Sequence, residues 1–67
     1  MNIPKSIRVA LAKHDMTRQQ LAERTQIHET NLSKMVNGRY GISSQQLERF
    51  ADAFDMKVSE FLALGED

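Results

Sequence analysis

The fold of this chain is constrained most by a series of short amphipathic segments that share one helical period. Apolar residues recur at spacings of three and four along nearly the whole sequence, and no strand-like alternation interrupts them. The segments at residues 17–25 and 29–37 have only about two turns each. Because isolated helices of this length are unstable in water, they must pack on neighbouring helices. The sequence therefore predicts an all-α fold, a compact bundle of five short helices.

Local signals place the ends of these helices. Thr17 and Gln20 have the spacing of a capping box, in which each side chain bonds the backbone N–H of the other residue, and Ser43 and Gln46 repeat the pattern. Gly38 suits the left-handed residue that ends a helix. The predicted helices cover residues 3–14, 17–25, 29–37, 43–54 and 58–64, and residues 65–67 are expected to form a frayed tail.

The length and composition exclude several classes of protein. Sixty-seven residues form a single domain, residues 1–67, that is too small for the deep pocket of most enzymes. The chain has no cysteine, and its two histidines lie 14 residues apart, so we expect no disulfide, no metal site and no cofactor. Neither a signal peptide nor an apolar run of about 20 residues is present. We therefore expect a cytoplasmic protein that is not an enzyme and does not enter a membrane.

The zero net charge conceals an uneven distribution along the sequence. Residues 1–40 contain seven Lys and Arg against three Asp and Glu, a net charge of +4. Residues 41–67 contain two basic residues against six acidic ones, a net charge of −4. The basic half could face a polyanion while the acidic half faces away from it, although a solvated surface could carry the same charges by chance.

The second and third predicted helices share an apolar inner face and differ in what they leave outside. The inner face contains Leu21, Ala22, Ile27, Leu32 and Met35. The small Ala22 lets two steeply crossing helices approach each other, and Ile27 fills the angle between them. The other side of the third helix is polar and contains Glu29, Thr30, Ser33, Lys34 and Asn37. This pattern predicts a helix-turn-helix whose second helix presents polar side chains to a DNA major groove.

Several stretches of the sequence also resemble one known family, the Cro/repressor-type (lambda-repressor-like) helix-turn-helix proteins. The resemblance rests on residues 16–24, Ile27, the stretch 31–38 and the closing pattern at 47–62, within residues 3–62 overall. It implies a compact five-helix domain that binds operator DNA, usually as a two-fold dimer. The family usually has glycine where this chain has Gln26, so we expect Gln26 to be left-handed at a cost on the order of 1 kcal/mol.

The family's geometry also implies which side chains contact DNA. The predicted base contacts are His28, Glu29, Thr30, Ser33 and Lys34. Lys34 can donate to guanine O6 and N7, and Glu29 can accept from a cytosine amino group. The alternative is that these side chains are simply solvated. The predicted phosphate contacts are Arg18, Gln19, Asn37, Arg39 and Tyr40, although Arg39 and Tyr40 could belong to an ordinary exposed loop.

Three large apolar residues at the last helix predict a contact between two copies of the chain. Some of Phe61, Leu62 and Leu64 must face the core, and any that remain outside would form an apolar patch of the kind that marks a partner surface. The alternative is that all three belong to the core. A homodimer is favoured because one domain that reads about five base pairs cannot specify a unique site in a genome. Two copies about 34 Å apart can do so.

The leading hypothesis is a sequence-specific transcriptional regulator, a repressor or Cro-like switch of phage or bacterial origin that acts on operator DNA at the nucleoid. Its activity would be controlled by concentration or by a partner protein. Controllers of restriction–modification operons and antitoxins belong to the same class, and the sequence does not separate them. The alternative is a helical protein-interaction module, antitoxin-like or anti-repressor-like, with weak or no DNA binding. The zero net charge and Glu29 favour this alternative.

Overall fold

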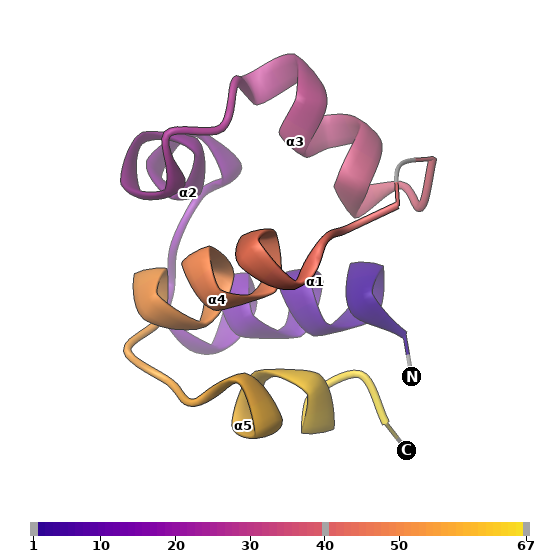
Figure 1. Ribbon diagram of the computed structural model, residues 1–67. Coiled ribbons are helices and arrows are strands. Elements are labelled where there is room, and N and C mark those ends of the chain that lie inside the picture. Colours follow the sequence, from indigo (N-terminus) through magenta and orange to yellow (C-terminus); the bar gives the residue numbers. More distant parts are fainter. Residues whose placement is uncertain (1, 40, 67) are drawn as a thin grey trace.

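A computed structural model describes residues 2–39 and 41–66, and these residues form five α-helices and no strand (Figure 1). The helices are α1 (Ile3–Lys13), α2 (Arg18–Thr25), α3 (Glu29–Val36), α4 (Ser44–Ala53) and α5 (Val58–Ala63). The all-α prediction is confirmed, and each helix end lies within one residue of its predicted position. Wherever a predicted helix is one residue longer than the observed helix, the additional residue is a helix cap. Cap residues make only half of the helical hydrogen bonds, so the structure does not count them in the helix.

Two reciprocal capping boxes fix where α2 and α4 begin. The Thr17 N–H donates to Gln20 Oε1 at 2.9 Å, and the Gln20 N–H donates to Thr17 Oγ1 at 3.1 Å. Ser43 and Gln46 make the same pair of bonds at 3.0 and 3.2 Å. Each box satisfies two backbone N–H groups at its helix start, as the sequence predicts.

Left-handed residues turn the chain at helix ends. Gln26, at the end of α2, has φ 58°, which confirms the conformation expected for it, and Gly38 after α3 has φ 77°. Asp15 and Asp55 follow α1 and α4 with φ 51° and 56°. Aspartate tolerates this conformation better than most residues, which allows both turns to form without glycine.

The helices surround one apolar interior, with α2 and α3 at one end of the molecule and α5 at the other. In Figure 1, α2 and α3 lie at the top, α5 lies at the bottom, and α1 and α4 cross the middle. α1 packs against α3 and α5, whereas α4 packs against α2 and α5. The helix-turn-helix formed by α2 and α3 is therefore held from below by α1 and α4.

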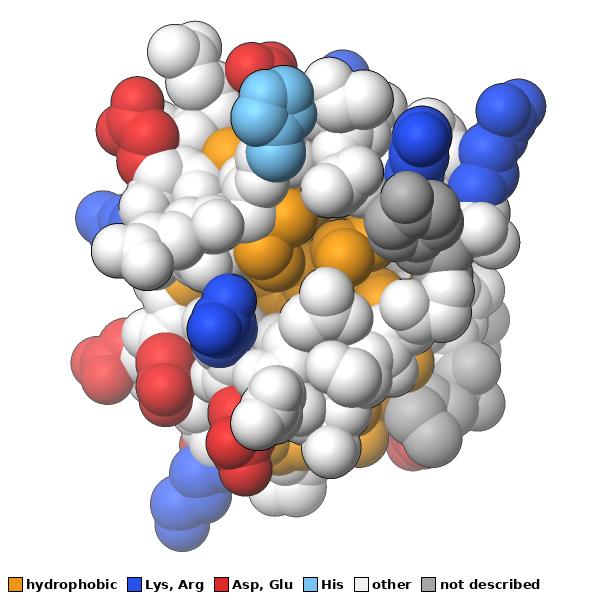
Figure 2. Space-filling view, turned by 45° about the horizontal axis from the view of Figure 1, so that its top comes forward, with side chains coloured by type: hydrophobic (Ala, Val, Ile, Leu, Met, Phe, Trp, Pro, Cys, Tyr) orange, Lys and Arg blue, Asp and Glu red, His pale blue; other side chains and the backbone are white. Residues whose placement is uncertain are grey.

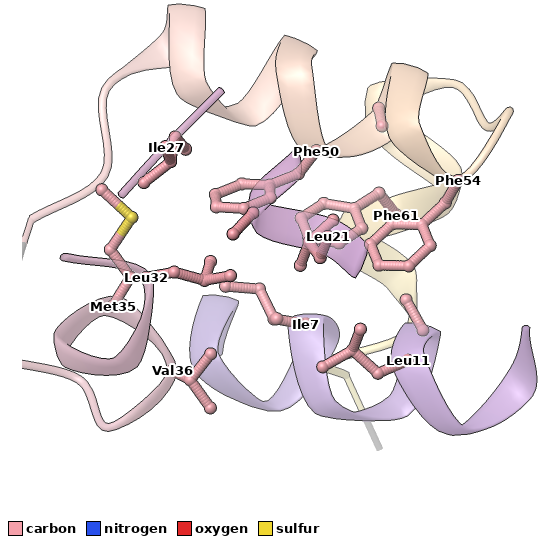
Figure 3. Packing of buried hydrophobic residues seen from close by; sticks show 13 residues of the cluster. Ile7, Leu11, Leu21, Ile27, Leu32, Met35, Val36, Phe50, Phe54 and Phe61 are labelled. Carbon is pink, nitrogen blue, oxygen red and sulfur yellow. The ribbon is translucent and has the colours of Figure 1, made fainter. Parts of the chain in front are cut away.

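Aromatic side chains form the lower part of the core. The Phe61 ring from α5 stacks on Phe50 of α4 and on Phe54, the C-cap residue of α4, with ring centroids 6.0 and 6.1 Å apart. In the upper part, Leu32 of α3 and Ile7 of α1 point toward each other, and both are fully buried (Figure 3). Burial of such side chains contributes roughly 1.5–3 kcal/mol each, which is the main force that holds these short helices together.

Two residues of the C-terminal region lie differently from the expectation. Phe61 is fully buried in the protomer and is therefore one of the residues that face the core, which leaves Leu62 and Leu64 for the predicted contact between copies. The stacking surface that α4 offers to its ring accounts for this burial. The frayed tail does not begin at Gly65, since this residue is buried and its N–H donates to the Leu62 carbonyl at 3.1 Å. Asp67 lies outside the described residues.

Candidate nucleic-acid interface

The position of α3 at one end of the molecule follows from which of its faces is apolar. Leu32, Met35 and Val36 are buried against the rest of the domain. The opposite face of the helix has no neighbouring element among the described residues and is exposed at the top of the molecule (Figure 1). Ala22 of α2, only 9% exposed, belongs to the buried cluster beneath α3. The small side chain at this position fits the close crossing of α2 and α3 that the sequence predicts.

The exposed face of α3 and the residues at its two ends form an open groove. It is lined by His28, Glu29, Thr30, Ser33, Lys34, Asn37 and Arg39. All five predicted base-contact residues are in this set, so the structure brings them together on one surface. Ser33 is partly buried and the other six are exposed. Whether these side chains contact bases stays a prediction.

His28 has a structural role that the sequence analysis missed. It is the N-cap residue of α3, and its ring Nδ1 accepts a hydrogen bond from the Thr30 N–H at 3.2 Å. Helix N-caps are usually Ser, Thr, Asp or Asn, so a histidine at this position is not recognised from residue preferences. The sequence indicates this capping role only through the position of His28 directly before Glu29, the first residue of the helix.

The predicted phosphate contacts fall into two groups. Arg18 and Gln19 are exposed in the first turn of α2, and the structure does not place them in the groove on α3. Asn37 and Arg39 line the groove at the other end of α3, where the Arg39 N–H donates to the Lys34 carbonyl at 2.8 Å. Tyr40 lies outside the described residues. A phosphate backbone on either side of a groove-bound helix would meet these two groups separately.

The groove itself has a slight excess of positive charge. Lys34 and Arg39 are its basic residues and Glu29 is its acidic one. In Figure 2, Lys and Arg side chains project at the upper right, and others lie at the centre, left and lower left, where most of the acidic side chains in this view also lie. Glu29 also lies in the first turn of α3, where a carboxylate interacts favourably with the helix dipole. Its presence in the groove therefore has a structural reason that is independent of DNA.

One basic residue of the N-terminal half is used to connect helices. The Arg24 Nη1 donates to the Ala53 carbonyl at 3.2 Å, which joins the last turn of α2 to the end of α4. This bond links residues 29 positions apart and satisfies a carbonyl at a helix end. Arg24 keeps its positive charge in this bond, but its side chain is directed to the end of α4 and does not line the groove on α3.

A metal site and a membrane span each require features that can be looked for in the described residues. Within residues 2–39 and 41–66, no three His, Asp or Glu side chains form a group that could hold a metal ion. None of the helices described has the length and apolar character needed to span a bilayer.

A polar groove on the second of two short, closely joined helices defines a DNA-binding helix-turn-helix domain. The chain belongs to the family of Cro/C1-type helix-turn-helix DNA-binding domains, whose model matches residues 6–67. The resemblance noted in the sequence is thereby confirmed, and it covers all five helices except the first residues of α1.

A curated relative extends the comparison. The chain is 34% identical over 67 residues to the competence pilus inhibition repressor of Acinetobacter baylyi. The match covers 100% of this chain and 61% of that protein, so the chain spans less than two thirds of the relative's length. No solved structure matches the chain.

Proposed function

We propose that this chain represses transcription by binding operator DNA with α3 in the major groove. The observation that carries the proposal is the groove of seven polar residues on the exposed face of α3 and at its two ends, the surface that a helix-turn-helix presents to DNA. Membership of the Cro/C1-type family and the likeness to a protein named as a repressor support it. A protein that acts in this way works at the nucleoid and needs no catalytic residue.

The residues of the groove divide by the kind of DNA contact they are suited to make. Lys34, in the last turn of α3, donates to guanine O6 and N7, and Thr30 offers a methyl group to thymine or a hydroxyl to either base class. His28, Glu29 and Ser33 complete the set of base contacts. Arg18 and Gln19 on one side, and Asn37 and Arg39 on the other, hold phosphates and fix the position of α3 without reading the sequence.

The regulator is proposed to bind as a homodimer through the C-terminal region. Leu62 and Leu64 remain partly exposed after Phe61 is assigned to the core, and both pack at its edge. Two copies related by a two-fold axis double the number of base pairs that are read, as a unique operator requires. The double variant L62Q/L64Q should bind a single half-site with unchanged affinity but lose most of its affinity for the complete operator. If the variant binds the complete operator as tightly as the natural chain does, the result would contradict this interface.

Selection of binding sites from random duplex DNA tests the proposal as a whole. We expect one enriched motif with two-fold symmetry, and an affinity for it that falls steeply as the salt concentration rises. A motif without symmetry would retain the DNA-binding role and remove the homodimer. No enrichment, together with no gel shift at low salt, would contradict DNA binding and favour the protein-interaction module.

A further inference from the structure

We propose that His28 contacts DNA by donating a hydrogen bond through Nε2–H, because its other nitrogen, Nδ1, is held by the backbone of the recognition helix. The part that concerns DNA rests on the proposed function, whereas the state of the ring in the free protein does not. The acceptor on DNA is a base-edge atom, such as guanine N7 or O6, or a phosphate oxygen. Both kinds of atom are hydrogen-bond acceptors, and the experiment below distinguishes between them.

The hydrogen bond to the backbone fixes which nitrogen carries the proton. Nδ1 accepts from the Thr30 N–H, so Nδ1 must be unprotonated when the cap is formed. A neutral imidazole has one N–H, which is then on Nε2. The capping bond therefore selects the tautomer of His28 whose proton is on Nε2.

The position of His28 leaves Nε2 available to a ligand in the groove. His28 is exposed and lines the same groove as Thr30 and Lys34. The charged side chains that line this groove with it are Glu29, Lys34 and Arg39. As a donor, Nε2–H complements guanine, adenine N7 and thymine O4 but faces another donor at the amino group of cytosine. A base contact by His28 should therefore exclude cytosine at one operator position.

His28→Ser is the matched variant, since serine is a good N-cap but is too short to reach the groove as the ring does. We expect H28S to keep the melting temperature of the natural chain and to bind the selected operator roughly two- to tenfold more weakly. An unchanged affinity of H28S for the operator would overturn the proposal. His28→Ala, which also lacks the cap, should lower the melting temperature as well.

Two further measurements separate the parts of the proposal. A long-range ¹H–¹⁵N spectrum of the free protein should show His28 Nδ1 as an unprotonated acceptor and Nε2 as the protonated nitrogen. The opposite tautomer would overturn the proposal even if the chain binds DNA. With H28S, relaxed selection against cytosine at one position assigns the acceptor to a base, whereas uniform weakening on all sequences assigns it to a phosphate. If the natural chain fails to bind DNA while the tautomer is as stated, the proposed function fails and only the capping role of His28 remains.

Discussion

Gly65 lies directly against the backbone carbonyl of Asn2, so the end of the chain after α5 is packed onto the first turn of α1. A methyl group at Gly65 would overlap the Asn2 carbonyl oxygen and the Ser6 hydroxyl. Ser6 is itself fully buried, and its Oγ donates to the Asn2 and Leu62 carbonyls at 3.2 and 3.4 Å. This contact joins the two ends of the sequence and holds α5, with its Phe61 ring, beneath the core.

Substitution of Gly65 by alanine should therefore destabilise the domain. The new methyl group meets backbone atoms that cannot move without shifting α1, and overpacking of this kind typically costs about 1–3 kcal/mol of folding free energy. Thermal unfolding followed by circular dichroism measures the effect. Gly41→Ala is the matched control, because no atom lies within 4 Å of a methyl group at Gly41. Equal melting temperatures for G65A and G41A would contradict the packing described here.

Thr17→Ala should lower stability by removing one half of the capping box on α2. The Gln20 N–H loses its acceptor, and loss of an N-cap side chain costs about 1 kcal/mol of folding free energy. Urea unfolding should show a lower midpoint with an unchanged slope. Thr17→Ser keeps the hydroxyl and should restore most of the stability. If T17S unfolds at the same urea concentration as T17A, the hydroxyl bond is not the source of the stability.

Gln26→Gly should leave the domain equally stable or make it more stable. Gln26 has φ 58°, a conformation that costs a residue with a side chain about 1–2 kcal/mol. Glycine removes this cost but loses more chain entropy on folding, about 0.5–1 kcal/mol, so the net gain is small. Gln19→Gly, at an exposed position inside α2, has no such strain to relieve and should be destabilising by about 1 kcal/mol. We therefore expect the melting temperature of Q26G to equal or exceed that of the natural chain, and the melting temperature of Q19G to be lower.

The parts of the fold that were predicted from the sequence are those that depend on near neighbours. Helix ends at Thr17 and Ser43 depend on a residue three positions away, and the left-handed Gln26 followed from the family resemblance. The contacts that could not be predicted join distant residues. Periodicity places Phe61 on an apolar face but does not say whether that face meets the core or a second protomer, and nothing local indicates that Gly65 meets Asn2.

In the candidate site, too, features that depend on spacing along one helix were predicted, and features that depend on side-chain orientation or on distant residues were missed. The polar face of α3 was predicted because spacing along one helix decides which side chains share a face. The capping bond of His28 was missed because it depends on a ring orientation rather than on a residue preference. The bond from Arg24 to the Ala53 carbonyl was missed because it spans α2 and α4.

Ala22→Leu should disrupt the crossing of α2 and α3. Ala22 is buried in the same core cluster as Ile27 and Leu32, and a larger side chain should force the two helices apart. The expected cost is about 1–3 kcal/mol of folding free energy, measured by denaturant unfolding. Ala12→Leu in α1 is the control, because Ala12 is exposed and its substitution should change stability by no more than about 0.5 kcal/mol. A variant A22L as stable as A12L would contradict the assigned packing.

Lys34→Ala separates base reading from simple charge attraction in the groove. If Lys34 donates to guanine O6 and N7, its loss should relax discrimination at one operator position by about 1–3 kcal/mol of binding free energy. A lysine that contacts only phosphate would instead weaken binding equally on all sequences and reduce the salt dependence of the affinity by about one counterion. Lys13→Ala is the matched control, since it removes the same charge from an exposed position in the last turn of α1, outside the groove. Binding of the two variants to operators mutated one base pair at a time distinguishes the outcomes. Discrimination that is unchanged in K34A at every position would remove Lys34 from the set of base contacts.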